Sequence, residues 1–176
     1  MADYAAPSRR SMNPSTDAGP FRLLFVCTGN TCRSPMAEVI ARHRIEERGW
    51  AQVEVRSAGV GAWDGSPASG GALRAAAASG LDLSGHASTY LTPELVESSD
   101  LILTMSAGHL SRALELGAGD RVTMLTAFAE DLEDGAAAAG IPDPIGGPDE
   151  EYAATFAVLD DLIDRALSRL EPIVKP

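Results

Sequence analysis

The chain alternates short apolar runs with longer stretches of helical spacing, and this alternation constrains its fold more than any other feature. The apolar runs are Arg22–Cys27, Val53–Ser57, Asp100–Met105 and Arg121–Leu125. Each run is short and bounded by turn residues, which is typical of a buried strand. Helices are expected over 35–48, 72–79, 107–116 and about 150–170. Strands that alternate with helices predict an α/β fold, here a four-stranded parallel sheet with helices on both faces.

The length indicates a single domain. The chain has 176 residues, enough for one domain and too few for two ordinary ones. Residues 1–20 are rich in Ala, Pro and Ser without periodicity, so they are expected to form a flexible leader before a domain that spans 21–176. No apolar stretch follows Arg9 and Arg10, so the leader does not resemble a secretory signal. No apolar run approaches the roughly 20 residues of a membrane helix, so no membrane partner is expected.

Charge and cysteine content exclude several classes of protein. The formal net charge is −11, and a chain this acidic repels a phosphate backbone, so no nucleic acid partner is expected. The two cysteines, Cys27 and Cys32, are too close in sequence to staple a fold and too few for a structural zinc site. They are expected to be reactive thiols of a cytoplasmic protein. The three histidines are scattered without ligand spacing, so no metal or cofactor is expected, and structural or surface roles are predicted for His43, His86 and His109.

The most informative segment is the loop between the first strand and the first helix. Cys27 begins this loop and Arg33 ends it, and Pro35 follows where proline suits the first turn of a helix. A helix N-terminus favours anions, and successive backbone N–H groups of a wrapped loop can point at one anion. Arg33 would then hold two phosphate oxygens with its guanidinium group. The expected phosphate-binding residues are Thr28, Gly29, Asn30, Thr31 and Cys32, of which Gly29 and Asn30 suit unusual backbone angles.

The same loop predicts a nucleophile. The field that binds an anion also stabilises a thiolate, so the pKa of Cys27 is expected to lie well below neutrality. A thiolate that faces a bound phosphoryl group is positioned to attack it. Ser34 is placed to donate a hydrogen bond to that sulfur. The competing interpretation is a buried core cysteine beside an ordinary helix start and a surface arginine. A Walker-type nucleotide loop is excluded because no Gly-Lys-Ser/Thr follows.

This pattern of Cys27, five residues and then Arg33-Ser34 resembles the signature of low-molecular-weight protein phosphatases. The likeness extends over about Phe21 to Leu170. Val26 stands where the conventional tyrosine phosphatases carry a histidine, as in the low-molecular-weight group. The family segments found in the expected order are Ser57-Ala-Gly59, Asp100–Met105 and Asp143-Pro144. The resemblance implies the same parallel sheet and a phosphorylated protein as substrate, and we expect a monomer or weak dimer.

A leaving group expelled by a thiolate needs a proton from the far side. The resemblance gives this role to Asp143, since the family places its general acid in an Asp-Pro loop. The same carboxylate would then activate water against phosphocysteine. The alternative for Asp143 is an ordinary Asp-Pro turn. Asp149 is the nearest rival and is expected to cap the last helix instead.

Three residues bear on the substrate through the resemblance. Thr31 stands where many tyrosine-specific relatives carry a bulkier aliphatic residue, as in the bacterial branch that removes phosphate from protein arginine. Ile145 follows the Asp-Pro pair where the tyrosine branch usually has aromatic residues, although an aromatic often precedes the glycines of the arginine branch too. Trp63 favours phosphotyrosine if it forms an aromatic wall, and its alternative role is a partly buried loop anchor. Phosphoarginine is therefore the predicted substrate and phosphotyrosine the alternative.

Cys32 has two possible roles. It is either a small buried loop residue or a resolving thiol that traps oxidised Cys27 as a reversible disulfide, which the resemblance supports.

Other functions use a similar loop. Arsenate reduction coupled to thioredoxin needs further relay cysteines, and none follows Cys32. A transport component that carries phosphate on cysteine does not require Arg33 and Asp143 together. A catalytically inactive binding module would not need the complete set of Cys, Arg, Ser and Asp.

Overall fold

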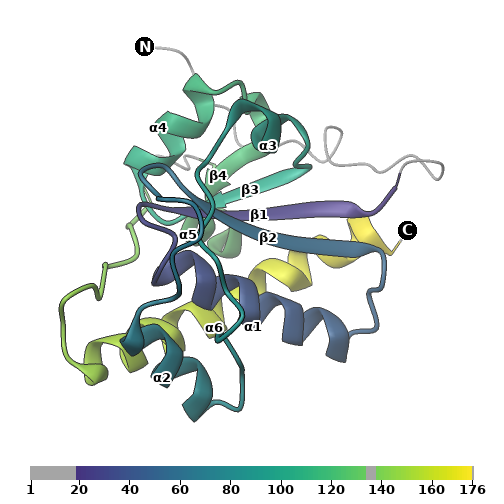
Figure 1. Ribbon diagram of the computed structural model, residues 1–176. Coiled ribbons are helices and arrows are strands. Elements are labelled where there is room, and N and C mark those ends of the chain that lie inside the picture. The colour runs from purple at the N-terminus through teal and green to yellow at the C-terminus, as the bar shows by residue number, and fades with distance from the viewer. Residues whose placement is uncertain (1–18, 134–137, 176) are drawn as a thin grey trace.

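The computed structural model describes residues 19–133 and 138–175. The predicted leader, apart from Gly19 and Pro20, therefore lies outside the described residues. Four strands form one sheet in the order β2-β1-β3-β4, and all three strand pairs are parallel (Figure 1). They are β1 (Phe21–Cys27), β2 (Val53–Gly59), β3 (Leu101–Thr104) and β4 (Val122–Met124). The predicted four-stranded parallel sheet is confirmed.

Helices cover both faces of this sheet. On one face lie α1 (Arg33–Glu47), α2 (Gly70–Ala78), α5 (Leu125–Glu130) and α6 (Asp149–Val174), whereas α3 (Pro93–Glu97) and α4 (Ala107–Glu115) lie on the other (Figure 1). A short 3-10 turn, η1 (Gly119–Arg121), precedes β4. Alternation along β1 fills both cores, because Leu23 and Phe25 join one and Leu24 and Val26 join the other. In the described part of the chain, no helix has the length and apolar character needed to cross a bilayer.

The order of the strands determines where a ligand site can form. The chain passes from β1 to β2 at one side and then crosses to β3 on the other side of β1. Between the carboxyl ends of β1 and β3 the connections run in opposite directions, and open α/β sheets bind ligands in the crevice at such a point. The loop after Cys27 and the segment Met105–Ser106 both begin at this edge.

Several predicted boundaries were wrong. The first helix begins at Arg33 rather than Pro35, so Arg33 and Ser34 belong to its first turn. The helix α5 was not predicted, because its residues 125 and 127–129 are buried and show no amphipathic period. Asp149 does not cap the last helix. Pro148 occupies the cap position, and Asp149 is the first helical residue.

Candidate active site

The phosphate-loop residues form a tight turn between β1 and α1. Cys27 is buried at the end of β1, and its Sγ lies 2.8 Å from the Ser34 Oγ in the first turn of α1. Backbone N–H groups of Asn30 and Ser34 also hydrogen bond to this sulfur. Asn30 has φ +54°, a left-handed conformation that asparagine tolerates better than most residues. The loop therefore wraps around the Cys27 sulfur.

A buried asparagine holds the loop together. Asn30 Nδ2 donates to Ser34 Oγ (2.8 Å) and to Ser57 Oγ (2.9 Å), and its Oδ1 accepts the Thr89 backbone N–H at 2.8 Å. His86 Nε2 lies 2.7 Å from the Asn30 carbonyl oxygen. The loop is thus fixed by residues of β2 and of the segment 86–89, which are far from it in sequence.

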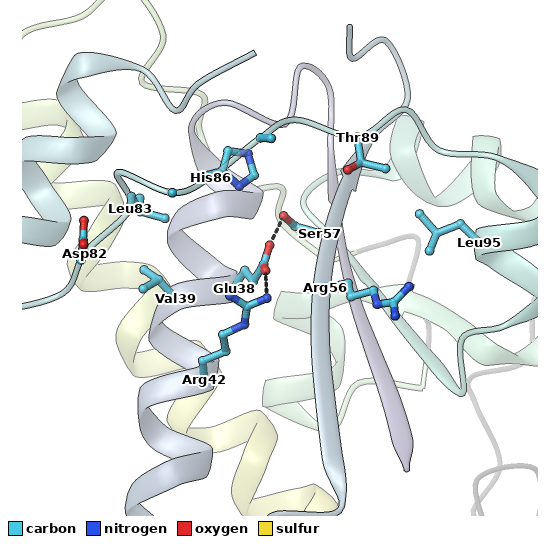
Figure 2. Close-up of a pocket in the computed structure, with 12 residues that line it drawn as sticks. Glu38, Val39, Arg42, Arg56, Ser57, Asp82, Leu83, His86, Thr89 and Leu95 are labelled. Carbon is cyan, nitrogen blue, oxygen red and sulfur yellow. Dashed lines mark hydrogen bonds and ion pairs between the residues drawn. The ribbon is translucent and has the colours of Figure 1, made fainter. Parts of the chain in front are cut away.

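This network extends behind the loop into a cavity of about 390 Å³. Figure 2 shows that Ser57 donates to the Glu38 carboxylate, which in turn pairs with Arg42 one turn further along α1. The sequence analysis did not give a site role to Glu38 or to the Ser57 side chain. Ser57 stands out in the sequence only as part of Ser57-Ala-Gly59, a segment similar to the family. A side-chain contact between α1 and β2 leaves no periodic signal in the sequence.

Arg33 connects the phosphate loop to the Asp-Pro segment. Its guanidinium group is almost fully buried, with Nη1 donating to the Ile141 carbonyl oxygen (2.9 Å) and Nη2 lying 3.2 Å from Asp143 Oδ2. The structure therefore brings Cys27, Ser34, Arg33 and Asp143 to one edge of the sheet. Asp143 remains partly exposed, and its Oδ1 accepts the Ile145 N–H at 3.2 Å.

The expected direction of the Cys27 pKa was wrong. Burial raises the pKa of this thiol above its ordinary value, although hydrogen bonds from Ser34 and Asn30 and the positive charge of Arg33 lower it. The residues of the loop indicate the interactions that lower this pKa, but not the burial that raises it. The charge of Arg33 is the smallest of these lowering interactions.

Two of the three histidines contact the phosphate loop, which their scattered positions did not indicate. His109, buried in the first turn of α4, has Nε2 at 2.8 Å from Thr28 Oγ1 and Nδ1 at 2.9 Å from Ser106 Oγ. Burial and the charge of Arg33 lower the pKa of His109 to about 4, and Asp143 acts in the opposite direction. His86 contacts the Asn30 carbonyl, whereas His43 is half exposed beside Glu47.

The proposed substrate-selecting residues differ in exposure. Thr31 is half-buried, and its carbonyl oxygen accepts the Ser69 N–H at 2.9 Å. Trp63 is 85% exposed, so the alternative role as a partly buried anchor was wrong. It lies two residues beyond Gly61, whose N–H donates to the Thr28 carbonyl at 2.9 Å. Ile145 is 63% exposed.

Asp149 is engaged elsewhere. Its carboxylate accepts three hydrogen bonds from Arg74 at 2.8–3.1 Å, and this pairing lowers the pKa of Asp149. It therefore lies in an ion pair between α2 and α6 and not beside Arg33.

Cys32 is buried beneath the loop. Its Sγ lies 3.1 Å from Ser69 Oγ and 3.5 Å from Tyr152 Oη. Both cysteines are free thiols in this structure. Across residues 19–133 and 138–175, no three His, Cys, Asp or Glu side chains gather as a possible metal site.

The fold and this loop define a class of protein. Residues 22–174 match the family model described as "Low molecular weight phosphotyrosine protein phosphatase", and the chain belongs to this family of cysteine-dependent protein phosphatases.

Two curated proteins and one solved structure illustrate the similarity. A protein-arginine-phosphatase of Geobacillus stearothermophilus is 38% identical over 86% of this chain and 97% of its own length. The low molecular weight protein-tyrosine-phosphatase Wzb of Escherichia coli K12 is 36% identical over 78% of this chain and 87% of its own. A YwlE arginine phosphatase mutant with a phosphorylated active-site serine in place of cysteine has a TM-score of 0.79 and 35% identity, covering 86% of this chain and 96% of its own.

Proposed function

We propose that this protein hydrolyses phosphoarginine in proteins through a phosphocysteine intermediate on Cys27. The observation that carries the proposal is the position of the Cys27 sulfur. The loop wraps around this sulfur, which lies 2.8 Å from Ser34 Oγ. Arg33 lies in the same loop and reaches Asp143 at 3.2 Å. The wider chemistry, phosphoryl transfer to a cysteine of a phosphorylated protein, is that of the family.

In the first step the Cys27 thiolate attacks phosphorus while Arg33 holds the phosphoryl oxygens. The bond between phosphorus and the leaving atom breaks, and its electron pair stays with the leaving group. Asp143 donates a proton to that leaving atom. In this structure the Asp143 carboxylate accepts a hydrogen bond from Arg33 Nη2. A bound phosphoryl dianion competes with Asp143 for the guanidinium group, which frees this carboxyl to face the leaving group.

In the second step Asp143 takes a proton from water, and the oxygen attacks phosphorus. The phosphorus–sulfur bond breaks and the thiolate leaves with the electron pair. Ser34 stabilises it by donating a hydrogen bond, because its Oγ is 2.8 Å from the sulfur. Asn30 Nδ2 donates to the Ser34 oxygen, and the Ser34 hydrogen has two acceptors in reach, the sulfur at 2.8 Å and the Ala58 carbonyl oxygen at 3.4 Å, of which the sulfur is the closer.

Phosphoarginine is favoured over phosphotyrosine by Thr31 and by the relatives described as protein-arginine-phosphatases. Ile145 after the Asp-Pro pair offers no aromatic ring to stack on a phenyl group. Phosphotyrosine is the second candidate because Trp63, 85% exposed, presents an indole to solvent two residues beyond Gly61, which bonds the Thr28 carbonyl.

The test compares kcat/KM on a phosphoarginine protein and on a phosphotyrosine peptide, for the unaltered chain and for Thr31→Ile. We expect the unaltered chain to prefer phosphoarginine and Thr31→Ile to reverse that preference. A preference of the unaltered chain for phosphotyrosine would instead favour Trp63 as the determinant and make the protein a tyrosine phosphatase.

We also propose that Cys32 protects Cys27 from irreversible oxidation in a reducing cytoplasm. Peroxide would oxidise the Cys27 thiolate to a sulfenic acid with release of hydroxide, and the Cys32 thiolate would then attack the sulfenic sulfur, expel hydroxide and form a disulfide. Peroxide-inactivated protein should recover activity with a dithiol, and Cys32→Ser should not. Equal recovery of both would show that Cys32 has no such role.

A further inference from the structure

A second set of side chains reaches the phosphate loop from the carboxyl end of β3, the neighbour of β1. Thr28 follows β1, and Ser106 and His109 lie at the start of α4, which follows β3 (Figure 1). β1 and β3 are paired neighbours, so their carboxyl ends meet at the same edge. A continuous chain of hydrogen bonds joins Ser106 Oγ to His109 (2.9 Å) and His109 to Thr28 Oγ1 (2.8 Å).

This series of hydrogen bonds ends at Arg33, the residue proposed to hold the phosphoryl group. Arg33 Nη2 lies 3.5 Å from Thr28 Oγ1, so the threonine oxygen is placed between the imidazole and the guanidinium group. Thr28 is an exposed residue, whereas His109 is 5% exposed. The loop end that faces the substrate is therefore held by a buried ring behind it.

The donors and acceptors in this chain favour one arrangement. Ser106 Oγ accepts the His109 backbone N–H at 3.4 Å as the cap of α4, which leaves its own hydrogen for Nδ1. A neutral imidazole has one N–H, and it then lies on Nε2 and is donated to Thr28. The Thr28 oxygen accepts from both His109 and Arg33, and its hydroxyl hydrogen is left for a bound anion.

We propose that His109 is a positioning residue of the active site, which fixes the Thr28 hydroxyl beside Arg33 so that it assists the binding of the phosphoryl group. The inference depends on phosphatase chemistry at Cys27 and not on which phosphorylated residue is the substrate.

The charges around His109 are consistent with a neutral ring. Arg33 faces it from α1 and Asp143 from the Asp-Pro segment, while Thr28 and Ser106 carry no charge. Arg33 and burial together keep the ring unprotonated at neutral pH, since they lower its pKa to about 4.

A double-mutant cycle with an aryl phosphate substrate tests the proposal. The variants are Thr28→Val, which keeps the shape and removes the hydroxyl, His109→Leu, and the two combined. Because one neutral hydrogen bond is at stake, each single variant should lower kcat/KM by roughly 3- to 10-fold. The combined variant should be no worse than either, since both remove the same interaction. Losses that multiply would overturn the proposal, as would full activity of Thr28→Val.

Rescue separates positioning from a merely structural role. Glutamine can present an amide N–H near the place of Nε2, so His109→Gln should recover most of the activity that His109→Leu loses. If Leu and Gln are equally impaired at equal melting temperature, the hydrogen bond to Thr28 is not what matters. His43→Gln is the matched control, because His43 is half exposed on α1 and pairs with Glu47. Thr28 is exposed, so Thr28→Val alone remains informative if His109→Leu fails to fold.

Discussion

At the scale of single residues, opposing interactions determine the pKa of the Cys27 thiol. Burial raises the pKa of the thiol, and Ser34 is the strongest interaction that lowers it. Replacement of Ser34 by alanine should therefore raise the pKa further. A hydrogen bond to a charged group is worth about 1.5–3 kcal/mol, so the pH midpoint for alkylation of Cys27 should rise by roughly 1–2. The measurement is the pH dependence of iodoacetamide labelling, read on the Cys27 peptide. An unchanged midpoint would mean that Ser34 does not stabilise the thiolate.

His109 should make stability depend on pH. Its pKa in the folded protein is about 4, below the ordinary 6.5, so the unfolded chain binds more protons between these values. The stability contributed by the neutral ring is complete above pH 6.5 and is lost as pH falls toward 4, by on the order of 3 kcal/mol. Urea unfolding at pH 7, 5.5 and 4.5 should show that the free energy of unfolding falls less steeply with decreasing pH for His109→Gln than for the unaltered chain. Parallel declines would contradict the lowered pKa.

At the scale of elements, the sequence predicted local structure better than contacts between distant segments. Thr92 caps α3 through a local signal, with its Oγ1 accepting the Leu95 N–H at 3.2 Å. The helices predicted over 35–48 and 72–79 end at Glu47 and Ala78, and Gly49 and Gly80 follow with φ values of +68° and +74°. The contacts of His86 and His109 with the loop join residues 56 and 81 positions apart, and no periodicity reports such pairs.

The end of β2 supports the phosphate loop by close approach of its backbone. A Cβ at Gly59 would lie 2.9 Å from the Asn30 backbone N and against the Thr28 carbonyl oxygen. Gly59→Ala should displace the loop, lower the free energy of unfolding by about 1–3 kcal/mol and reduce kcat/KM. Gly85→Ala is the control, because a Cβ there meets nothing within 4 Å. Chemical denaturation and kinetics check both, and equal behaviour of the two variants would show that Gly59 does not support the loop.

At the scale of the whole molecule, strand order determines which segments meet. The order β2-β1-β3-β4 puts the ends of β1 and β3 together, and Arg33 links them to the Asp-Pro segment before α6. The sequence indicated Cys27, Arg33 and Ser34 by their types and spacing, and Asp143 through the family resemblance. It did not indicate Glu38, the Ser57 side chain or His109, which act through neighbours that only the fold supplies. Although the net charge is −11, the described residues hold a buried guanidinium group, that of Arg33, at the edge where the anionic substrate is proposed to bind.

The most direct test of the account is to trap phosphate on Cys27. An aryl phosphate with a good leaving group needs little help from an acid, but hydrolysis of phosphocysteine still needs Asp143 as base. In Asp143→Ala, stopped-flow should therefore show a burst of one aryl alcohol per active site followed by slow turnover, and acid-quenched protein should carry one phosphoryl group on the Cys27 peptide. The Cys27→Ala variant should show neither. Slow turnover of Asp143→Ala without a burst, or a phosphoryl group on any other residue, would contradict a double displacement through Cys27 with Asp143 as acid and then base.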